Sequence, residues 1–575
     1  MRILLLTHAF NSLTQRLGAE LQRRGYEISI EFDIADSVAE EAVALFRPDL
    51  IVAPYLRRAI PESIWKHHVC LIVHPGIVGD RGPSALDWAI QSGAAEWGVT
   101  VLQAEAAMDA GPVWASAVFP LRMTKKSSIY RNEVTQAATQ AVLQAVERFA
   151  TGGFAPTPLA ACKDVRGSMR PLMKQVERAI DWQRDNTATV LRKVNAADGF
   201  PGVADSLFDI PCHIFDVWPE AALRGAPDAR VGDLLARRET AVLRKTIDGA
   251  VWIGHAKREG SFKLPVTLAF AAESTVLPEA PLDGWWRQEG TTWQDIAYEE
   301  SGGVGFLHFE FYNGAMSSTQ CERLRMALAW AKRRPVRVLV LMGGADFWSN
   351  GIHLNVIEAA SLRDGSPADE SWNNINAMND LARELIETGG QITVAALGGN
   401  AGAGGCFLAR AADLVWARDG VMLNPHYKNM GNLYGSEYWT YLLPRRVGDE
   451  AARAIMCNRQ PLTAQGAVES GFTDACLAGD PDAFRIDVAR RAAEIASAPD
   501  LEGRLEAKRA RRLQDEAEKP LAQYREEELS QMRRNFYGFD PSYHVARHHF
   551  VRKSLASWTP RHLARHRDLG WSVPQ

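Results

Sequence analysis

Phe347-Trp-Ser-Asn-Gly-Ile352 and Gly399-Asn-Ala-Gly-Ala-Gly-Gly405 are two glycine turns, and each follows a strand-like apolar run, over residues 337–342 and 392–397. Open turns at the ends of strands are where layered α/β folds place their ligands. Backbone N–H groups in such turns are fixed before a reaction begins, and glycine lets the chain approach an acyl group closely. The two turns therefore predict an α/β layer with a ligand site at the ends of its strands, shaped like an oxyanion hole.

Other motifs flank the two turns in a fixed order. They are Ala297-Tyr-Glu-Glu-Ser-Gly-Gly-Val304 and Tyr312-Asn-Gly-Ala-Met316 before them, and Leu442-Leu-Pro-Arg-Arg-Val-Gly448 and Leu462-Thr-Ala-Gln-Gly-Ala-Val468 after them. This order resembles the crotonases, the enoyl-CoA hydratase/isomerase family. The resemblance implies that the N–H groups of Ile352 and Gly404 bind a thioester oxygen, and that Gly405 belongs to a turn that binds coenzyme A. The alternative is that these glycines only allow tight packing of helix on strand.

Two departures from the crotonase pattern change the expected chemistry. The positions of the two glutamates with which crotonases add water are occupied by Phe407 and His426, so hydration of an enoyl-CoA is not expected. We expect Glu437 to be the proton acceptor and Tyr427 its hydrogen-bonding or proton-relaying partner, with His426 as the competitor. Burial would raise the pKa of such an acid, as a base that works near neutrality needs. The surrounding aromatic residues are Tyr434, Tyr438 and Trp439. The alternative is that these aromatics pack the core and Glu437 is solvated.

The start of the chain has the pattern of a second α/β layer. Strand-like runs over residues 3–6, 28–32, 50–53 and 70–73 alternate with helical stretches such as 13–24 and 37–46. Such alternation is typical of a parallel sheet wrapped by helices.

Motifs in this first layer resemble the folate-dependent formyltransferases. They are Cys70-Leu-Ile-Val-His-Pro-Gly76, Gly79-Asp-Arg-Gly-Pro-Ser84, Trp97-Gly-Val-Thr-Val-Leu-Gln103 and Met108-Asp-Ala-Gly111. The resemblance implies that His74 and Asp109 lie beside a transferred formyl group, since formyl transfer needs a donor to the developing oxyanion and a group that manages the nucleophile's proton. Two residues before the histidine, where the family has an asparagine, this chain has Ile72. One donor to the oxyanion is therefore missing, and we expect an unusual acceptor of the formyl group.

The loop His8-Ala-Phe-Asn-Ser-Leu-Thr-Gln15 leads from the first strand into the first helix, where free backbone N–H groups could receive a phosphate. The candidate residues for binding folate or coenzyme A in the first domain are Asn11, Ser12, Thr14, Gln103 and Arg131, the last as a charge-assisted partner if the fold brings it near. The alternative is that Asn11 or Ser12 simply caps the helix.

The middle of the chain resembles the carboxy-terminal module of the same formyltransferases, through Ala179-Ile-Asp-Trp182, Ala197-Asp-Gly-Phe-Pro-Gly202 and the alternating run Gly249-Ala-Val-Trp-Ile-Gly-His255. We therefore expect a multidomain α/β protein. It would have a Rossmann-like formyltransferase domain over residues 1–155, a small β-rich (OB-like) companion module over 156–275, a linker over 276–292, and a crotonase-like α/β domain with C-terminal helices over 293–575. Within the last part, residues 501–531 predict a charged, solvated helix with one packing stripe.

Composition limits the other possibilities. A net charge of -4 gives no reason to expect nucleic acid or membrane lipid as a partner, and the apolar run at residues 3–6 is far too short for a secretory signal or a spanning helix, so we expect a cytoplasmic protein. The 7 cysteines are scattered, which argues against a disulfide framework or zinc site. The pairs His544/His548 and His562/His566 have the spacing of metal ligands on a helix, but no cysteine or carboxylate motif accompanies them, so helix packing or a partner contact is favoured and no metal is expected.

The order of these parts resembles the HoxX proteins, which mature nickel–iron hydrogenases. The resemblance implies transfer of formyl from 10-formyl-tetrahydrofolate to coenzyme A, followed by release of carbon monoxide from formyl-CoA as a ligand for the hydrogenase iron, with hydrogenase maturation proteins as partners. Formyl-CoA hydrolysis, formyl transfer to another acceptor, and a non-catalytic scaffold that binds folate and coenzyme A are the alternatives. Oligomeric state, the hydrogenase served and the movement of coenzyme A between sites stay open.

Overall fold

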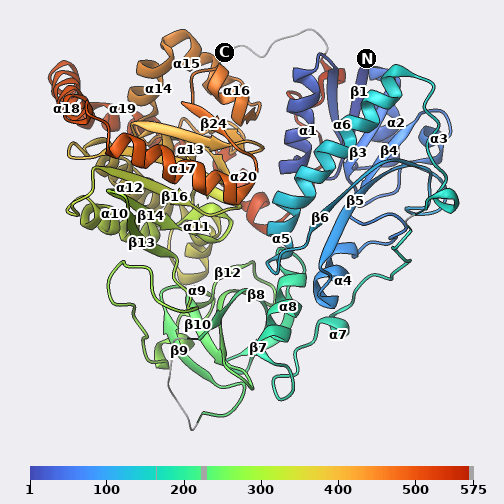
Figure 1. The fold of residues 1–575 in the computed structure, drawn as a ribbon, viewed down its shortest axis with the longest axis horizontal. Coiled ribbons are helices and arrows are strands. Elements are labelled where there is room, and N and C mark those ends of the chain that lie inside the picture. The colour runs from blue at the N-terminus through green and yellow to red at the C-terminus, as the bar shows by residue number, and fades with distance from the viewer. Residues whose placement is uncertain (164, 222–228, 569–575) are drawn as a thin grey trace.

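The computed structural model describes residues 1–163, 165–221 and 229–568. Figure 1 shows the N-terminal domain (blue to cyan) on the right, a small module (green) below, and the C-terminal domain (yellow-green to red) on the left. Within the described residues, no helix is both long and apolar enough to cross a membrane.

The N-terminal domain is a six-stranded sheet in the order β2-β1-β3-β4-β5-β6. Its strands are β1 (Arg2–Thr7), β2 (Glu27–Phe32), β3 (Leu50–Tyr55), β4 (Cys70–His74), β5 (Glu96–Gln103) and β6 (Val113–Pro120). Its helices are α1 (Ser12–Arg23), α2 (Asp36–Phe46), α3 (Glu62–Trp65), α4 (Ala85–Ser92), α5 (Lys126–Ile129), η1 (Tyr130–Val134) and α6 (Thr135–Thr151). The predicted strands and helices are confirmed, but the sheet is mixed and not parallel throughout, because β5 runs antiparallel to both β4 and β6.

Helices cover both faces of this sheet, which explains the unbroken apolar run of its first strand. Ile3 and Leu5 face one buried cluster, whereas Leu4 and Leu6 face another on the opposite side. Because successive side chains of a strand alternate between faces, a strand buried on both sides needs apolar residues at every position. Each such buried side chain contributes roughly 1.5–3 kcal/mol to folding.

The small module is an antiparallel sheet in the order β7-β8-β11-β10-β9, with β12 paired to β11. Its strands are β7 (Val203–Leu207), β8 (Ile210–Glu220), β9 (Leu234–Arg238), β10 (Ala241–Lys245), β11 (Ala250–Arg258) and β12 (Leu264–Pro265). Its helical segments are α7 (Gln175–Arg178), α8 (Thr187–Ala197), α9 (Val266–Ala269) and η3 (Glu273–Val276), and η2 (Leu159–Ala161) lies in the connection from α6. This confirms the predicted β-rich character of the module.

The C-terminal domain has a main sheet in the order β13-β14-β16-β19-β21-β24, parallel except for the β13–β14 pair, and two small sheets, β17-β20-β22-β23 and β15-β18. The strands are β13 (Ile296–Ser301), β14 (Val304–Phe309), β15 (Ala315–Met316), β16 (Val338–Gly343), β17 (Phe347–Ser349), β18 (Gly351–Ile352), β19 (Ile392–Leu397), β20 (Asn400–Gly402), β21 (Leu414–Arg418), β22 (Met422–Asn424), β23 (Leu462–Thr463) and β24 (Ala475–Leu477). The helical segments up to residue 496 are η4 (Tyr312–Gly314), α10 (Ser318–Ala331), α11 (Leu354–Ala359), η5 (Ala360–Arg363), α12 (Pro367–Ile386), α13 (Gly404–Arg410), α14 (Trp439–Val447), α15 (Asp449–Cys457), α16 (Ala464–Glu469) and α17 (Pro481–Ala496). The two glycine turns follow β16 and β19, as the sequence predicts.

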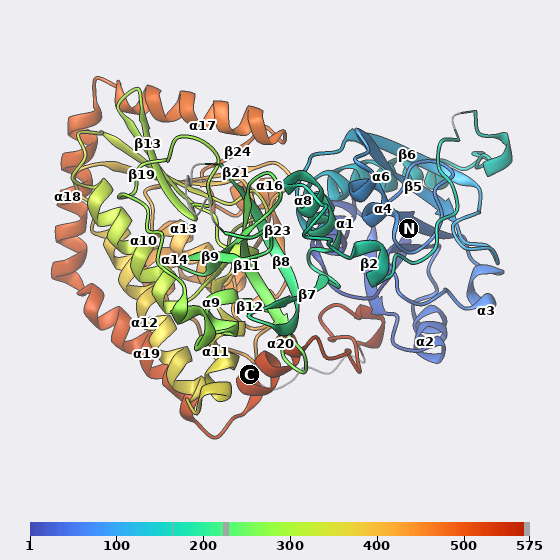
Figure 2. The same ribbon diagram turned by 90° about the horizontal axis from the view of Figure 1, so that it is seen from below.

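The charged segment near the C-terminus is two helices, α18 (Leu501–Glu518) and α19 (Leu521–Tyr537), and not one solvated helix. Pro520 precedes α19 and ends the first helix, since proline has no N–H to continue it. The α19 helix runs along the edge of the C-terminal domain in Figure 2. It buries one stripe of its side chains. The stripe consists of Leu521, Tyr524, Glu528, Met532 and Phe536.

After α20 (Ser542–Arg552), the chain returns to the N-terminal domain. Thr559 Oγ1 accepts the N–H of Phe32 at 2.9 Å, and the carbonyl of Leu563 accepts the N–H of Ile30 at 3.0 Å, along the edge strand β2. His566, in η6 (Arg565–Arg567), shares a 2.9 Å hydrogen bond with the fully buried carboxylate of Glu31. The C-terminal tail thus fastens the last domain to the first.

Candidate active sites

His74 ends strand β4, and its ring lies between two carboxylates. Its Nε2 atom is 2.8 Å from Asp80 Oδ2, and its Nδ1 atom is 3.5 Å from Asp109 Oδ2. The Asp109 backbone is left-handed, with φ at 52°, and its carboxylate also accepts the N–H of Gly82 at 3.1 Å. Because His74 is only 5% exposed, this pairing fixes the orientation of the imidazole, as a general acid–base group requires. The sequence prediction paired His74 with Asp109 and missed Asp80, although Asp80 lies within a quoted motif.

The loop after β1 caps helix α1 with Asn11, whose Oδ1 accepts the N–H of Thr14 at 3.0 Å. Asn11 and Ser12 both line a large cleft. Thr14 was expected to bind folate or coenzyme A, but its side chain does not face the cleft. It is fully buried, and its hydroxyl bonds to Thr7 and Asn11.

Arg131 also lines this cleft, and its hydrogen bond and ion pair are with residues of the C-terminal domain, so its predicted role as a partner for a phosphate stays a prediction. Its guanidinium bonds to Asn313 Oδ1 at 3.2 Å, pairs with Asp346 at 3.6 Å and lies 4.6 Å from the ring centroid of Phe347. Gln103 lines the cleft too, and its side-chain oxygen accepts the indole N–H of Trp114 at 3.1 Å.

The two glycine turns of the C-terminal domain lie against each other. A Cβ added to Gly351, where φ is 77°, would lie 3.2 Å from the backbone nitrogen of Gly404. Gly404 is the first residue of α13, so the helix has no carbonyl partner for its N–H. Ala403, just before it, has the left-handed φ of 47°, which is strained for a residue with a side chain. This arrangement brings Gly404 beside the turn that ends in Ile352.

Gly405 has a packing role and does not line the cleft. A Cβ at this position would lie 2.1 Å from the carbonyl oxygen of Ser349, so only glycine allows α13 to pack this closely on β17. Gly405 therefore has a packing role, and its predicted contact with coenzyme A stays a prediction.

The Glu437 carboxylate lies directly on the second turn. A Cβ at Gly404 would be 2.5 Å from Glu437 Oε1, and Tyr427 donates its hydroxyl proton to Glu437 Oε2 at 2.5 Å. Glu437 is 1% exposed, and this burial raises its pKa to about 7 although the hydrogen bond from Tyr427 acts in the opposite direction. Burial and the neighbouring Glu437 also raise the pKa of Tyr427 well above its ordinary value. Glu437 is therefore a buried acid that can gain or lose a proton near neutrality.

Phe407 and His426, which occupy the positions of the two crotonase glutamates, have other surroundings than Glu437. Phe407 is fully buried and stacks on Tyr427, with ring centroids 5.6 Å apart. His426 is also buried, and burial lowers its pKa to about 4. Among the described residues, neither ring nitrogen of His426 has a hydrogen-bond partner. His426 is thus a neutral imidazole, and no hydrogen bond joins it to Glu437 in the described part of the chain.

One cleft of about 1780 Å³ connects the two halves of the protein. From the N-terminal domain it is lined by His74, Asp109, Asn11, Ser12, Gln15, Ile72, Gln103 and Arg131, and from the C-terminal domain by Phe347, Asn350, Asn400, Asn424 and Lys553. Asn350 belongs to the first glycine turn, and Asn400 to the second. The cleft therefore runs from the His74 site to the entrance of the glycine turns.

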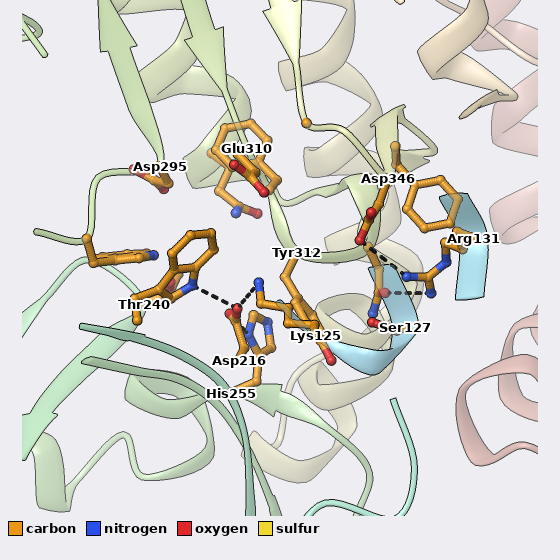
Figure 3. A pocket seen from close by; sticks show the side chains of 17 residues that line it. Lys125, Ser127, Arg131, Asp216, Thr240, His255, Asp295, Glu310, Tyr312 and Asp346 are labelled. Atoms are coloured by element: carbon orange, nitrogen blue, oxygen red, sulfur yellow. Dashed lines mark hydrogen bonds and ion pairs between the residues drawn. The ribbon is translucent and has the colours of Figure 1, made fainter. Parts of the chain in front are cut away.

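Buried charged groups line a second, small pocket where the three parts of the protein meet. Figure 3 shows Lys125 of the N-terminal domain pointing at Asp216 of the small module. The Nζ atom of Lys125 lies 2.6 Å from Oδ1 of Asp216. His255 lies 2.8 Å from the same carboxylate and stacks on Tyr312 of the C-terminal domain, whose hydroxyl donates to Asp198 at 2.8 Å. Burial alone would raise the pKa of Asp216, but Lys125 and His255 outweigh it and hold that pKa well below its ordinary value.

The C-terminal histidines take part in packing. His544 shares a hydrogen bond with the carbonyl of Phe536, His548 pairs with Glu358, and His566 pairs with Glu31. Within the described residues, no group of three or more side chains has the arrangement of a metal site.

Two family models match the chain: Formyl transferase over residues 29–146 and Enoyl-CoA hydratase/isomerase over residues 305–560. The hydrogenase maturation factor HoxX of Bradyrhizobium diazoefficiens is 53% identical over 569 residues, which cover 99% of this chain and 97% of that protein. The chain belongs to the HoxX family of hydrogenase maturation factors.

Further similarities agree with this membership. The crystal structure of HypX from Aquifex aeolicus in complex with tetrahydrofolic acid matches 100% of both chains, with a TM-score of 0.95 and 47% sequence identity. The methionyl-tRNA formyltransferase of Ralstonia nicotianae is 25% identical over 44% of this chain and 77% of its own length. This HoxX-family chain thus joins a formyltransferase domain to a crotonase-like domain.

Proposed function

We propose that this protein transfers the formyl group of 10-formyl-tetrahydrofolate to coenzyme A and then splits formyl-CoA into carbon monoxide and coenzyme A. The observation that carries the proposal is the single cleft lined both by the His74 site and by residues of the two glycine turns. A product formed at the first site could reach the second without leaving the protein. The bound tetrahydrofolic acid in the related HypX structure supports folate as the formyl donor.

Charge in the cleft supports a polyanionic second substrate. Lys553 and Arg131 both line it, and burial together with the nearby Arg131 lowers the pKa of Lys553. Two cations held close together in a cleft favour phosphate groups such as those of coenzyme A.

In the first reaction, His74 accepts the thiol proton and delivers it to the folate nitrogen, while the bond from formyl carbon to sulfur forms and the bond to nitrogen breaks. Asp80 and Asp109 keep the imidazole in place. The missing asparagine at Ile72 is consistent with a thiol as the acceptor in place of the usual amine.

In the second reaction, the N–H groups of Ile352 and Gly404 hold the formyl oxygen, and Glu437 takes the formyl proton. The electrons of the C–H bond stay on carbon as the lone pair of carbon monoxide, and those of the C–S bond leave with the thiolate. Tyr427 and Glu437 then return the proton to sulfur, which restores the thiol. A formyl group has no α-carbon, so the enolate chemistry of crotonases is not available to it.

The test of the proposal is to incubate the protein anaerobically with 10-formyl-tetrahydrofolate and coenzyme A, with a haem protein as the reporter of carbon monoxide. The expected result is the spectrum of carbon-monoxide-bound haem. Folded protein that produces only formate would support a hydrolase instead. Glu437→Gln separates an enzyme from a scaffold, because it should abolish carbon monoxide release while both substrates still bind.

We also propose that the reaction takes place in the cytoplasm and that its product serves the nickel–iron hydrogenase through other maturation proteins. The described cysteines are all free, which fits a reducing compartment.

A further inference from the structure

Glu437 lies on a strained corner of the backbone. Glu437 and the following Tyr438 both have a φ of 59°, a left-handed conformation that residues with side chains rarely adopt. Two successive residues of this kind persist only where the surroundings hold them. The corner also directs the Glu437 carboxylate onto Gly404.

Two buried side chains from distant helices hold this corner through its backbone N–H groups. Asn379 of α12 accepts the N–H of Glu437 at 2.8 Å, and Glu528 of α19 accepts the N–H of Tyr438 at 3.0 Å. Asn379 is fully buried and Glu528 is 1% exposed. The two helices thus clamp the residues on which the second site depends.

Glu528 also caps helix α14, which begins at Trp439 with no side-chain cap from its own N-cap residue. It accepts the N–H of Thr440 at 2.9 Å and the hydroxyl of Thr440 at 2.6 Å. A neutral serine or asparagine would satisfy a helix N-terminus at far lower desolvation cost than a buried carboxylate. The negative charge therefore needs an explanation beyond capping.

The negative charges of the two carboxylates are not balanced by positive charges beside them. Within the described residues, neither Glu437 nor Glu528 takes part in a salt bridge, and the nearby charge of Glu437 adds to burial in raising the pKa of Glu528. The remaining titratable or charged groups facing the pair or the adjoining Tyr438 are Cys321, Tyr427, Tyr434, Arg383 and Arg525. The two arginines are near the Tyr438 ring, so no cation directly offsets the repulsion between the two acids.

We propose that Glu528 is a positioning residue for the second reaction: its carboxylate holds Glu437 on the glycine turn, and its negative charge strengthens the attraction of Glu437 for a proton. This inference rests on the proposed function. A base that must remove a formyl proton gains from a nearby negative charge, because that charge favours the protonated product of the step. The N-terminus of α14 stabilises the charge on Glu528 while the proton moves.

The titration of the pair is consistent with this role. Burial raises the pKa of Glu437 to about 7 and that of Glu528 to about 8. Two buried, interacting carboxyls lose their protons in steps that belong to the pair, and the last proton leaves only above neutrality. The state in which both carboxyls are ionised, and in which Glu437 is the stronger base, therefore forms as the pH rises.

The test follows carbon monoxide release from supplied formyl-CoA as a function of pH. Glu528→Gln removes the charge, so the acid limb of the profile should move to lower pH by on the order of one unit. The maximal rate should fall about tenfold, because Glu437 becomes a weaker base. Thr440→Val removes one hydrogen bond to the carboxylate, which makes the fully ionised pair less stable and should move the limb to higher pH. Glu527→Gln, on the exposed side of the same helix, is the matched control and should leave the profile unchanged.

Thermal unfolding and formyl transfer at the His74 site establish that each variant is folded. If Glu528→Gln does not fold, the milder Thr440→Val decides the question alone. Folded variants that keep the wild-type acid limb, whatever their rate, overturn the inference and leave Glu528 a structural cap. A wild-type protein that releases no carbon monoxide from formyl-CoA overturns the proposed function instead, and the inference with it.

Discussion

Gly404→Ala should stop the second reaction and spare the first. The added Cβ would lie 2.5 Å from Glu437 Oε1 and 2.7 Å from its carboxyl carbon, well inside van der Waals contact. The carboxylate would have to retreat by roughly 1 Å, and a misplacement of that size typically costs about 100-fold in rate, or about 2.7 kcal/mol in the barrier. Glu437 has little room to move elsewhere, because Asn379 and Glu528 hold its backbone and that of Tyr438.

The assay for this variant separates the two reactions. With 10-formyl-tetrahydrofolate and coenzyme A supplied together, we expect formyl-CoA to accumulate, as measured by mass spectrometry, while carbon monoxide release falls about 100-fold. Gly390→Ala is the matched control, since a Cβ there has no atom within 4 Å. Carbon monoxide release within about threefold of wild type, or an equal loss of both reactions in folded protein, would refute the placement of Glu437 on this turn.

Three further predictions concern other parts of the protein. Asp80→Asn removes the carboxylate 2.8 Å from the catalytic histidine, so formyl transfer should fall by at least about 100-fold while supplied formyl-CoA is still split; equal loss of both activities would count against it. Tyr427→Phe removes a hydrogen bond that lowers the pKa of Glu437, so that pKa should rise above about 7 and the acid limb of carbon monoxide release should move to higher pH; a limb that moves down contradicts the assignment. Lys125→Met leaves Asp216 buried without its cation, which should cost about 3 kcal/mol of stability near neutrality, seen as a lower Tm. Because the folded-state pKa of Asp216 is depressed, its contribution to stability is present above the unfolded pKa and is lost as the pH falls, so the difference in Tm between wild type and Lys125→Met should shrink in acid.

The elements of the fold that could be predicted are those whose burial is visible in the local pattern of apolar residues. Strand β1 is covered by helices on both faces, so each of its positions from Ile3 to Leu6 is apolar and the strand is visible in the sequence. The two glycine turns were visible for a similar reason, since positions such as Gly351 and Gly405 tolerate no side chain. The mixed direction of the first sheet was missed because β5 carries the same apolar pattern whichever way it runs.

The parts of the sites that could not be predicted depend on contacts between distant segments. Asn379 and Glu528 hold the backbone of Glu437 and Tyr438 from helices that are far away in the sequence. In the sequence alone, Glu528 cannot be told apart from the exposed glutamates of the same charged segment. Asp80 meets His74 only because of how the intervening loop folds. The return of the tail to strand β2 through Thr559 likewise leaves no periodic signal in the sequence.

The central claim is that one carbon passes through both sites and leaves as carbon monoxide. The most direct measurement supplies 10-formyl-tetrahydrofolate labelled with ¹³C in the formyl group, together with less coenzyme A than folate, and follows the label under anaerobic conditions with a haem protein present. Our account predicts labelled carbon monoxide on the haem in excess of the coenzyme A added, because coenzyme A is regenerated in each cycle. Label that ends in formate or remains in formyl-CoA, with no labelled carbon monoxide from folded protein, would contradict it.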